Sequence, residues 1–198
     1  MKPALTLFAL ILSSFIAFGQ RSGILFMPKI GAAFNSVYDH PTGDNPWTFK
    51  FSPLLIGLEA SKEISGRTAG SADLYFLRRG THSKLQNGRR LDDYNFDYLV
   101  LGAQLKYMLF PQLRLEAFAG PYAGYCIRAE HRYSSDEEFA NYKHDDFKDF
   151  DFGAHIGLGK YFNIAGLDFL VQPRFQLGLT RFSYTKHISF QLMLGVRV

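Results

Sequence analysis

"LRLEAFAGPYAGYCIRAEHRY", residues 113–133, alternates between two kinds of side chain along its whole length. Its odd positions are apolar from Leu113 to Ala129, whereas its even positions mix charged residues, glycines and aromatic rings. Successive side chains of a β-strand point to opposite faces of the sheet, so this pattern predicts one long strand with two unlike faces. The stretch is much longer than the roughly 5–6 residues of an ordinary strand in a globular protein.

The same alternation recurs along the rest of the chain, between short clusters of turn-forming residues. Within residues 94–109 the alternation changes phase near Leu99, which indicates a β-bulge. The sequence predicts eight strands, over residues 23–37, 51–64, 69–83, 94–109, 113–132, 149–162, 166–183 and 187–197.

The connections between these strands alternate in length. The short ones lie at 65–68, 110–112 and 163–165, and the long polar ones at 38–50, 84–93 and 133–148. Strands of 9–11 residues or more can cross a bilayer, and a sheet in hydrocarbon must close because an open edge would leave polar groups unpaired. The predicted fold class is all-β: an eight-stranded antiparallel up-and-down transmembrane β-barrel with short periplasmic turns and longer outer loops.

The N-terminus has the layout of an export signal. Lys2 precedes an apolar run over residues 4–12, and the small residues Ala17 and Gly19 precede a cleavage point before Gln20. We therefore expect a signal peptide over residues 1–19, a barrel domain over 20–198, and a location in the cell outer membrane. A net charge of +4 without a dense basic block gives no indication of nucleic-acid binding.

A second stretch, "AHIGLGKY" at 154–161, is similar to a phosphate-binding loop but lacks two of its residues. Ala154 stands in place of the first glycine of that motif and Tyr161 in place of its hydroxyl residue. The glycines of residues 153–159 instead share the inward face of a strand. There they make room for large side chains from neighbouring strands, which we expect to be Phe118, Tyr122, Arg128 and Arg174.

The inward face of the predicted barrel carries charges of both signs. Eight strands enclose an interior only wide enough for side chains, so we expect these charges to fill it as ion pairs. A narrow conductance through rearranging pairs is the alternative. The predicted structural network comprises Arg114, Glu116, Arg128, Glu130, Asp149, Asp151, His155, Asp168, Arg174 and Arg197, and the wider inward set adds Lys29, Glu59, Glu63, Asp73 and Lys106.

The same face could also carry chemistry. Asp149, Asp151 and His155 share one strand face and could provide a general base with an orienting carboxylate. The loop 133–138 offers serines nearby, although such polar loops are ordinarily plain solvated surface. We expect no catalytic site.

Metal and cofactor sites are not expected either. His131 and His144 flank the acidic part of the loop 133–148, but they do not match the spacing of any common metal site.

Aromatic residues gather at the end of the first long loop. Trp47, Phe49 and Phe51 are expected at the lipid headgroup level, where aromatic rings form a girdle around a barrel. A ligand-contacting role for this loop is the alternative.

Four blocks together resemble the PorT-like outer-membrane β-barrel family: "SADLYFLRRGTH" (71–82), "FDYLVLGAQLKYML" (96–109), "LEAFAGPYAGYCI" (115–127) and "FDFGAHIGLGKYF" (150–162). The resemblance covers essentially the whole mature chain and implies an exported barrel. One named member of that family is linked to protein secretion across the outer membrane.

The sequence therefore predicts a small plugged outer-membrane barrel with a structural or protein-interaction role, and not an enzyme. An accessory role in protein secretion follows only from the resemblance, and a barrel enzyme acting on lipid or peptide is a further alternative. We expect a monomer that contacts outer-membrane lipid, and a possible protein partner bound through the loops 38–50, 84–93 or 133–148.

Overall fold

The computed structural model describes residues 23–38, 49–84, 90–135, 138–142, 150–180 and 186–197. The predicted signal peptide, Trp47 and Asp149 lie outside these residues. The strands are β1 (Ile24–Tyr38), β2 (Lys50–Ser65), β3 (Thr68–Lys84), β4 (Arg90–Phe110), β5 (Leu115–Ser135), β6 (Glu138–Tyr142), β7 (Phe150–Ile164), β8 (Leu167–Gly178) and β9 (Lys186–Arg197). One 3-10 turn, η1 (Pro111–Leu113), joins β4 to β5.

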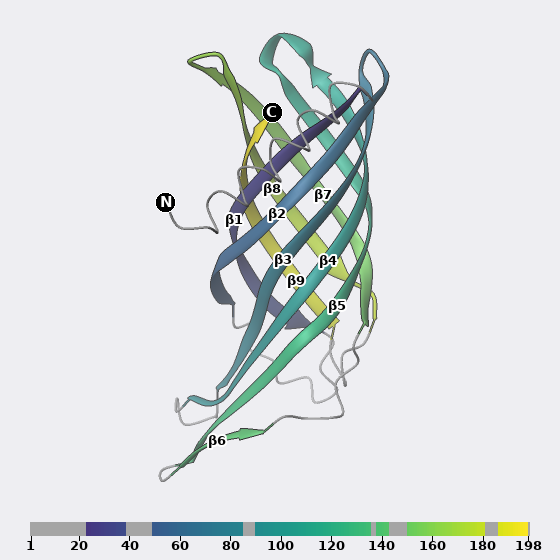
Figure 1. The fold of residues 1–198 in the computed structure, drawn as a ribbon. Coiled ribbons are helices and arrows are strands. Elements are labelled where there is room, and N and C mark those ends of the chain that lie inside the picture. Colours follow the sequence, from purple (N-terminus) through teal and green to yellow (C-terminus); the bar gives the residue numbers. More distant parts are fainter. Residues whose placement is uncertain are drawn as a thin grey trace, which may run out of the picture.

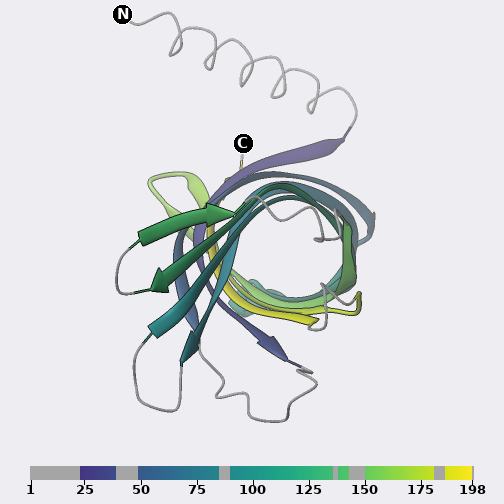
Figure 2. The ribbon, with the colours of Figure 1, turned by 90° about the horizontal axis from the view of Figure 1, so that it is seen from below.

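Eight of these strands form a closed barrel. The sheet order is β4-β3-β2-β1-β9-β8-β7-β5-β6, and an additional pairing of β4 with β5 joins the two sides into a ring (Figure 2). Neighbouring strands are antiparallel throughout. Figure 1 shows the tight turns at one end, here called the turn end, and the long connections at the other, the loop end. The predicted fold class is confirmed.

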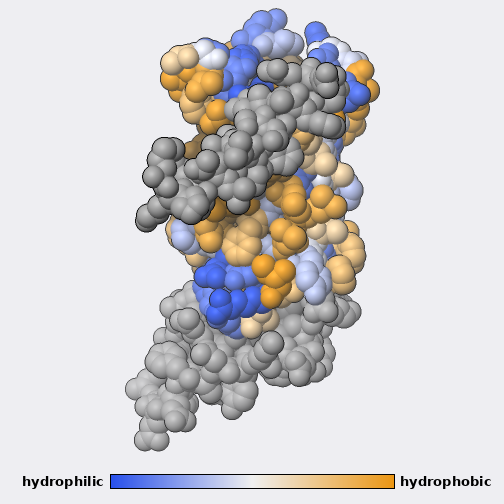
Figure 3. Space-filling model, viewed as in Figure 1, coloured by the Kyte–Doolittle hydropathy of each residue, from blue (hydrophilic) through white to orange (hydrophobic). Residues whose placement is uncertain are grey.

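The outer surface of the barrel is apolar. Every barrel strand exposes large hydrophobic side chains, among them Ile30, Leu101, Ile156 and Leu194. The middle of the face in Figure 3 is mainly hydrophobic, and hydrophilic residues gather toward the ends. Within the described residues no helix is long and apolar enough to cross a membrane.

The interior is more polar than a soluble protein core. The buried set of the described residues contains twenty polar or charged side chains and twelve hydrophobic ones, so the usual distribution is inverted. Glycines of β7 make space for two of the largest: a Cβ on Gly153 would meet the Tyr122 ring, and one on Gly157 would meet the Phe118 ring. The stretch at 154–161 is a strand, as predicted.

At the loop end, β4, β5 and β6 contain more strand than the sequence predicts, whereas β8 ends at Gly178, short of the predicted residue 183. β4 begins at Arg90, β5 continues to Ser135, and β6 pairs with the end of β5 from Ser135↔Glu138 to His131↔Tyr142. Much of the predicted loops 84–93 and 133–148 is therefore paired. In the sequence these segments lack the alternation that marks the other strands, as expected where neither face of a sheet is buried.

A bulge in β5 corrects two sequence predictions. Asp97 pairs with Arg128 and Tyr98 with Cys126, which leaves Ile127 as an extra residue. Beyond this bulge the faces exchange, and the Arg128 side chain is 62% exposed. The prediction that Arg128 and Glu130 lie in the lumen is wrong for this reason. The phase change predicted in β4 near Leu99 is also wrong, because the inward positions of β4 run without interruption: Phe96, Tyr98, Val100, Gly102, Gln104 and Lys106.

Candidate functional site

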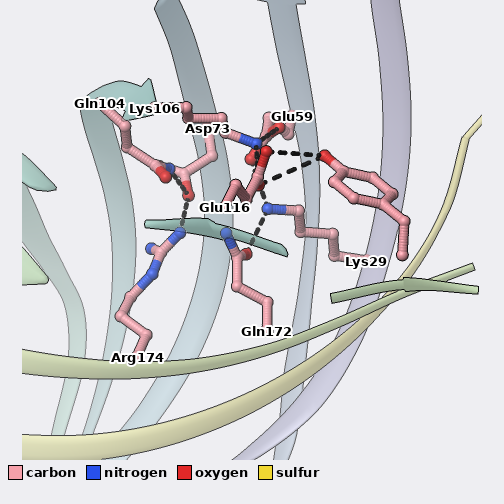
Figure 4. Close-up of polar contacts among 9 residues, drawn as sticks. Lys29, Glu59, Asp73, Gln104, Lys106, Glu116, Gln172 and Arg174 are labelled. Carbon is pink, nitrogen blue, oxygen red and sulfur yellow. Dashed lines mark hydrogen bonds and ion pairs between the residues drawn. The ribbon is translucent and has the colours of Figure 1, made fainter. Parts of the chain in front are cut away.

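The lumen contains a network of buried ion pairs, whose part nearest the turn end centres on Glu59 (Figure 4). Its carboxylate accepts hydrogen bonds from Lys29 Nζ and, at 2.5 Å, from Lys106 Nζ. Lys29 also donates to Gln172 Oε1 at 2.6 Å, and Lys106 Nζ lies 3.3 Å from Glu116 Oε1. Side chains from β1, β2, β4, β5 and β8 therefore meet at one point in the lumen.

The next group lies around Asp73 of β3. Its Oδ2 accepts from Arg174 Nη2 of β8 at 2.5 Å and from Gln104 Nε2 of β4 at 2.7 Å. The Arg174 guanidinium also lies over two rings, 5.3 Å from the Tyr75 centroid and 5.4 Å from the Phe118 centroid. This arginine, fully buried, ties opposite sides of the barrel together.

The third group, nearer the loop end, surrounds Asp151 of β7. Asp151 Oδ2 accepts from Arg79 Nη1 and, at 2.8 Å, from the Tyr122 hydroxyl, while its Oδ1 accepts from Thr180 Oγ1 at 2.8 Å. Arg79 lies 4.9 Å from the Tyr98 ring centroid. The contact of Arg79 with Asp151 joins β3 to β7 across the lumen.

These three groups balance in charge. A buried charge is tolerated when it is paired and hydrogen-bonded, and here each cation has a carboxylate partner. The lumen network consists of the cations Lys29, Arg79, Lys106 and Arg174 and the anions Glu59, Asp73, Glu116 and Asp151. The arrangement fills the lumen and links strands that are not neighbours in the sheet.

The residues predicted as one charge network in the lumen lie in different parts of the barrel. Four are buried in the lumen: Glu116, Asp151, His155 and Arg174. Three others lie near the turn end: Arg114, Asp168 and Arg197.

At the turn end, the Arg114 guanidinium donates to both oxygens of Asp168, at 2.9 Å and 2.6 Å. These hydrogen bonds raise the pKa of Arg114, which lies in the turn between β4 and β5. This pair is therefore separate from the buried network.

The sequence reasoning missed Arg79, although a signal for it exists. Two adjacent arginines stand at 78 and 79, and only one of them can point inward. The inward face of β3 includes Asp73, Tyr75 and Leu77, and continuing that alternation selects Arg79.

Among the described residues, the hypothetical base and carboxylate pair of His155 with Asp151 is not formed; Asp149, the other carboxylate considered, lies outside them. His155 lies between two rings, 6.1 Å from the Phe118 centroid and 6.4 Å from the Tyr122 centroid, and neither of its ring nitrogens hydrogen-bonds to any residue that the structure describes. Asp151 is held by Arg79, Tyr122 and Thr180 instead.

No metal site is found in the described part of the chain, where no group of three or more His, Cys, Asp or Glu side chains could hold an ion. The His131 side chain and His144, which the sequence analysis considered as ligands, lie outside what the structure describes.

Two of the three predicted interface aromatics are described. Phe49 and Phe51 are each 54% exposed near the loop end of β2, and the Phe51 ring lies 5.0 Å from Phe34. A second pair on the outer surface, Tyr125 and Phe150, has a centroid distance of 5.1 Å. An aromatic girdle at this level stays a prediction.

A closed eight-stranded barrel with an apolar exterior and a paired polar lumen defines an integral outer-membrane β-barrel protein. The model of the outer membrane protein beta-barrel domain family matches residues 18–184. The chain belongs to this family, and its place is the cell outer membrane. A comparison with curated protein sequences gives no match.

Solved structures share the fold. The attachment invasion locus protein Ail of Yersinia pestis is 15% identical, with a TM-score of 0.50 over 88% of this chain and 98% of that one. The structure of Ail from Yersinia pestis in complex with the heparin analogue sucrose octasulfate has 17% sequence identity and a TM-score of 0.51, and the match covers 88% of this chain and 99% of that one. Neisserial surface protein A has 15% sequence identity and a TM-score of 0.50, and the match covers 87% of this chain and 96% of that one. Similarity at this level supports the fold alone.

Proposed function

We propose that the protein is a small plugged barrel that presents a rigid sheet for protein interaction beyond the outer membrane surface. It acts as a monomeric scaffold anchored in lipid, and the lumen network has a structural role. The observation that carries the proposal is the continuation of β3, β4 and β5 past the end of the barrel, where β6 pairs with β5.

The extension consists of β3, β4, β5 and β6. The pairing of β2 with β3 stops at Leu55↔Leu77, and that of β5 with β7 stops at Tyr125↔Phe150. β3 nevertheless stays paired with β4 as far as Lys84↔Arg90, and β5 stays paired with β6. Figures 1 and 2 show these strands projecting to one side of the ring.

The extension has two open edges. Among the described strands, none pairs with the outer side of β6 or with β3 beyond Leu77. An open edge presents unpaired N–H and C=O groups, and an extended peptide can add to it as a further strand. The partner that fits this surface is a protein segment in extended conformation.

Site-specific photo-crosslinking on intact cells tests this role. We expect a cross-linker at position 139, in β6, to capture a protein. The register with β5 places the N–H of residue 141 on the open edge of β6, so the substitution Asn141→Pro should abolish capture because proline cannot donate a backbone hydrogen bond. A cross-linker at position 164, at the opposite end of β7, is the matched control. Capture at 164 alone would overturn the proposal and favour an accessory of secretion, which otherwise rests on family resemblance.

A role without catalysis fits the surroundings of His155. Its imidazole is enclosed in the lumen against two aromatic rings, and no nucleophile hydrogen-bonds to it in the described residues. If the barrel is not a lipid hydrolase, His155→Ala leaves the lipid composition of the outer membrane unchanged. A changed lipid A profile would contradict this.

A further inference from the structure

A cavity of about 180 Å³ lies in the periplasmic mouth of the barrel, at the opposite end from the projecting sheet. The turn between β2 and β3 contributes Arg67, the turn after β4 contributes Arg114, and the last residue of β9 contributes Arg197. Its apolar wall includes Met27 and Met108. The lumen network closes the cavity on the inner side.

The inner wall of the cavity carries no net charge. It is formed by Lys106 and Glu116, which lie 3.3 Å apart, and Lys106 is also bound to Glu59. The Tyr161 hydroxyl, a further lining group, lies 3.3 Å from both carboxylate oxygens of Glu116. These groups are held by each other, so any free charge of the cavity comes from its rim.

The rim has an excess of positive charge. Arg114 is neutralised by its bidentate contact with Asp168. Arg67 and Arg197 also line the cavity, and neither forms an ion pair with any residue that the structure describes; the same holds for Glu63, the remaining lining carboxylate. Arg197 is the cross-strand partner of Asp168, so Arg114 and Arg197 share this carboxylate. Among the described residues of the rim, the three arginines against Asp168 and Glu63 leave a net charge of +1.

We propose that this cavity is a binding site for a small oxyanion of the phosphate or carboxylate type, reached from the periplasm and held by Arg67 and Arg197. Guanidinium groups donate paired hydrogen bonds that match the oxygens of both anions. The cavity holds more than a bare ion, and its apolar wall suits a short carbon substituent on the anion.

Methionine methyl groups provide a direct readout of binding. Of the four methionines of the chain, Met27 and Met108 line the cavity, whereas Met193 is buried elsewhere in the lumen. In the folded full-length protein with ¹³C-methyl methionine, titration with inorganic phosphate should shift the signals of Met27 and Met108 and leave Met193 unchanged. Separate titrations with glycerol 1-phosphate and with glutarate distinguish a phosphate ester and a carboxylate from the free ion.

Variants of the rim test which residues bind the anion. We expect the double substitution Arg67→Gln and Arg197→Gln to weaken binding at least tenfold for every ligand that binds. Arg128→Gln removes an arginine exposed at the other end of the barrel and should leave the affinity unchanged. The proposal is overturned if none of the three ligands shifts Met27 or Met108, or if the double variant binds as tightly as the parent chain.

Discussion

Glu59 is the carboxylate that binds two of the four cations of the lumen network. It is 0% exposed and is the shared partner of Lys29 and Lys106, one from each side. Neutralising it leaves two buried ammonium groups with too few carboxylates, and breaking a buried pair from one side costs about 3–5 kcal/mol. We therefore expect Glu59→Gln to lower the free energy of unfolding by that amount, measured by urea titration in lipid vesicles.

Glu63→Gln is the control for this effect. Glu63 is an exposed carboxylate on the same strand without an ion pair in the described structure, and surface substitutions usually change stability by less than about 0.5 kcal/mol. Equal losses for the two variants would mean that the buried pairing does not stabilise the barrel.

Gly157 allows the Phe118 ring to cross the lumen. A Cβ there would collide with the ring and with the Pro173 carbonyl oxygen, which is backbone and cannot turn away. Overpacking of this kind costs about 1–3 kcal/mol, so we expect Gly157→Ala to lower the urea midpoint of unfolding. Gly66→Ala, where a Cβ would meet nothing within 4 Å, should leave the midpoint unchanged. A midpoint for Gly157→Ala equal to that of the parent chain would contradict this packing.

Among the elements, β5 shows a feature that alternation alone does not reveal. The extra residue in its bulge is Ile127, and the odd positions around it are Tyr125 and Ala129, so the apolar series continues through the bulge without a break. The residues after it nevertheless change sides: Ala129 packs against the lumen cluster. Strands β7, β8 and β9 have no bulge of this kind, and there the period of two predicted the inward and outward faces correctly.

The buried residues of the candidate site could be predicted from the sequence wherever the alternation of their strand is unbroken. Asp151, His155 and Arg174 lie on strands with unbroken alternation, and the sequence placed them inside. The sequence does not show which side chains pair across the ring, nor where the projecting sheet lies. Pairing across the ring, such as Arg79 with Asp151, depends on barrel closure and stagger, which a linear pattern does not contain. The strands of the projecting sheet carry no period-two signal in the sequence, as expected where neither face of a sheet is buried.

The bulge can be tested by the labelling of single cysteines. In a background in which the only native cysteine is replaced, Cys126→Ser, we expect Arg128→Cys to react quickly with a membrane-impermeant maleimide and Ala129→Cys to be protected. Unbroken alternation predicts the reverse order, because it places residue 128 in the lumen and residue 129 outside. Faster labelling at 129 than at 128 would therefore show that β5 has no bulge at Ile127.

At the scale of the whole molecule, the barrel and its contents form one unit, because the ion pairs join strands on opposite sides of the ring. Arg79, Arg174, Tyr98 and Phe118 are among the largest fully buried side chains. A lumen filled in this way should not pass ions.

Planar-bilayer recording measures this directly. We expect no current steps from the parent protein, because Asp73, Arg174 and Phe118 fill the middle of the lumen. The triple substitution Asp73→Ser, Arg174→Ser and Phe118→Ala removes an ion pair together with the ring beside it, so no buried charge of that pair is left alone, and it should produce stable steps. The matched control is Arg78→Ser with Asp97→Ser, which removes an ion pair of 2.6 Å from the outer face of β3 and β4. Steps from the parent protein, or equal conductance of the triple variant and this control, would show that the side chains in the lumen are not a plug.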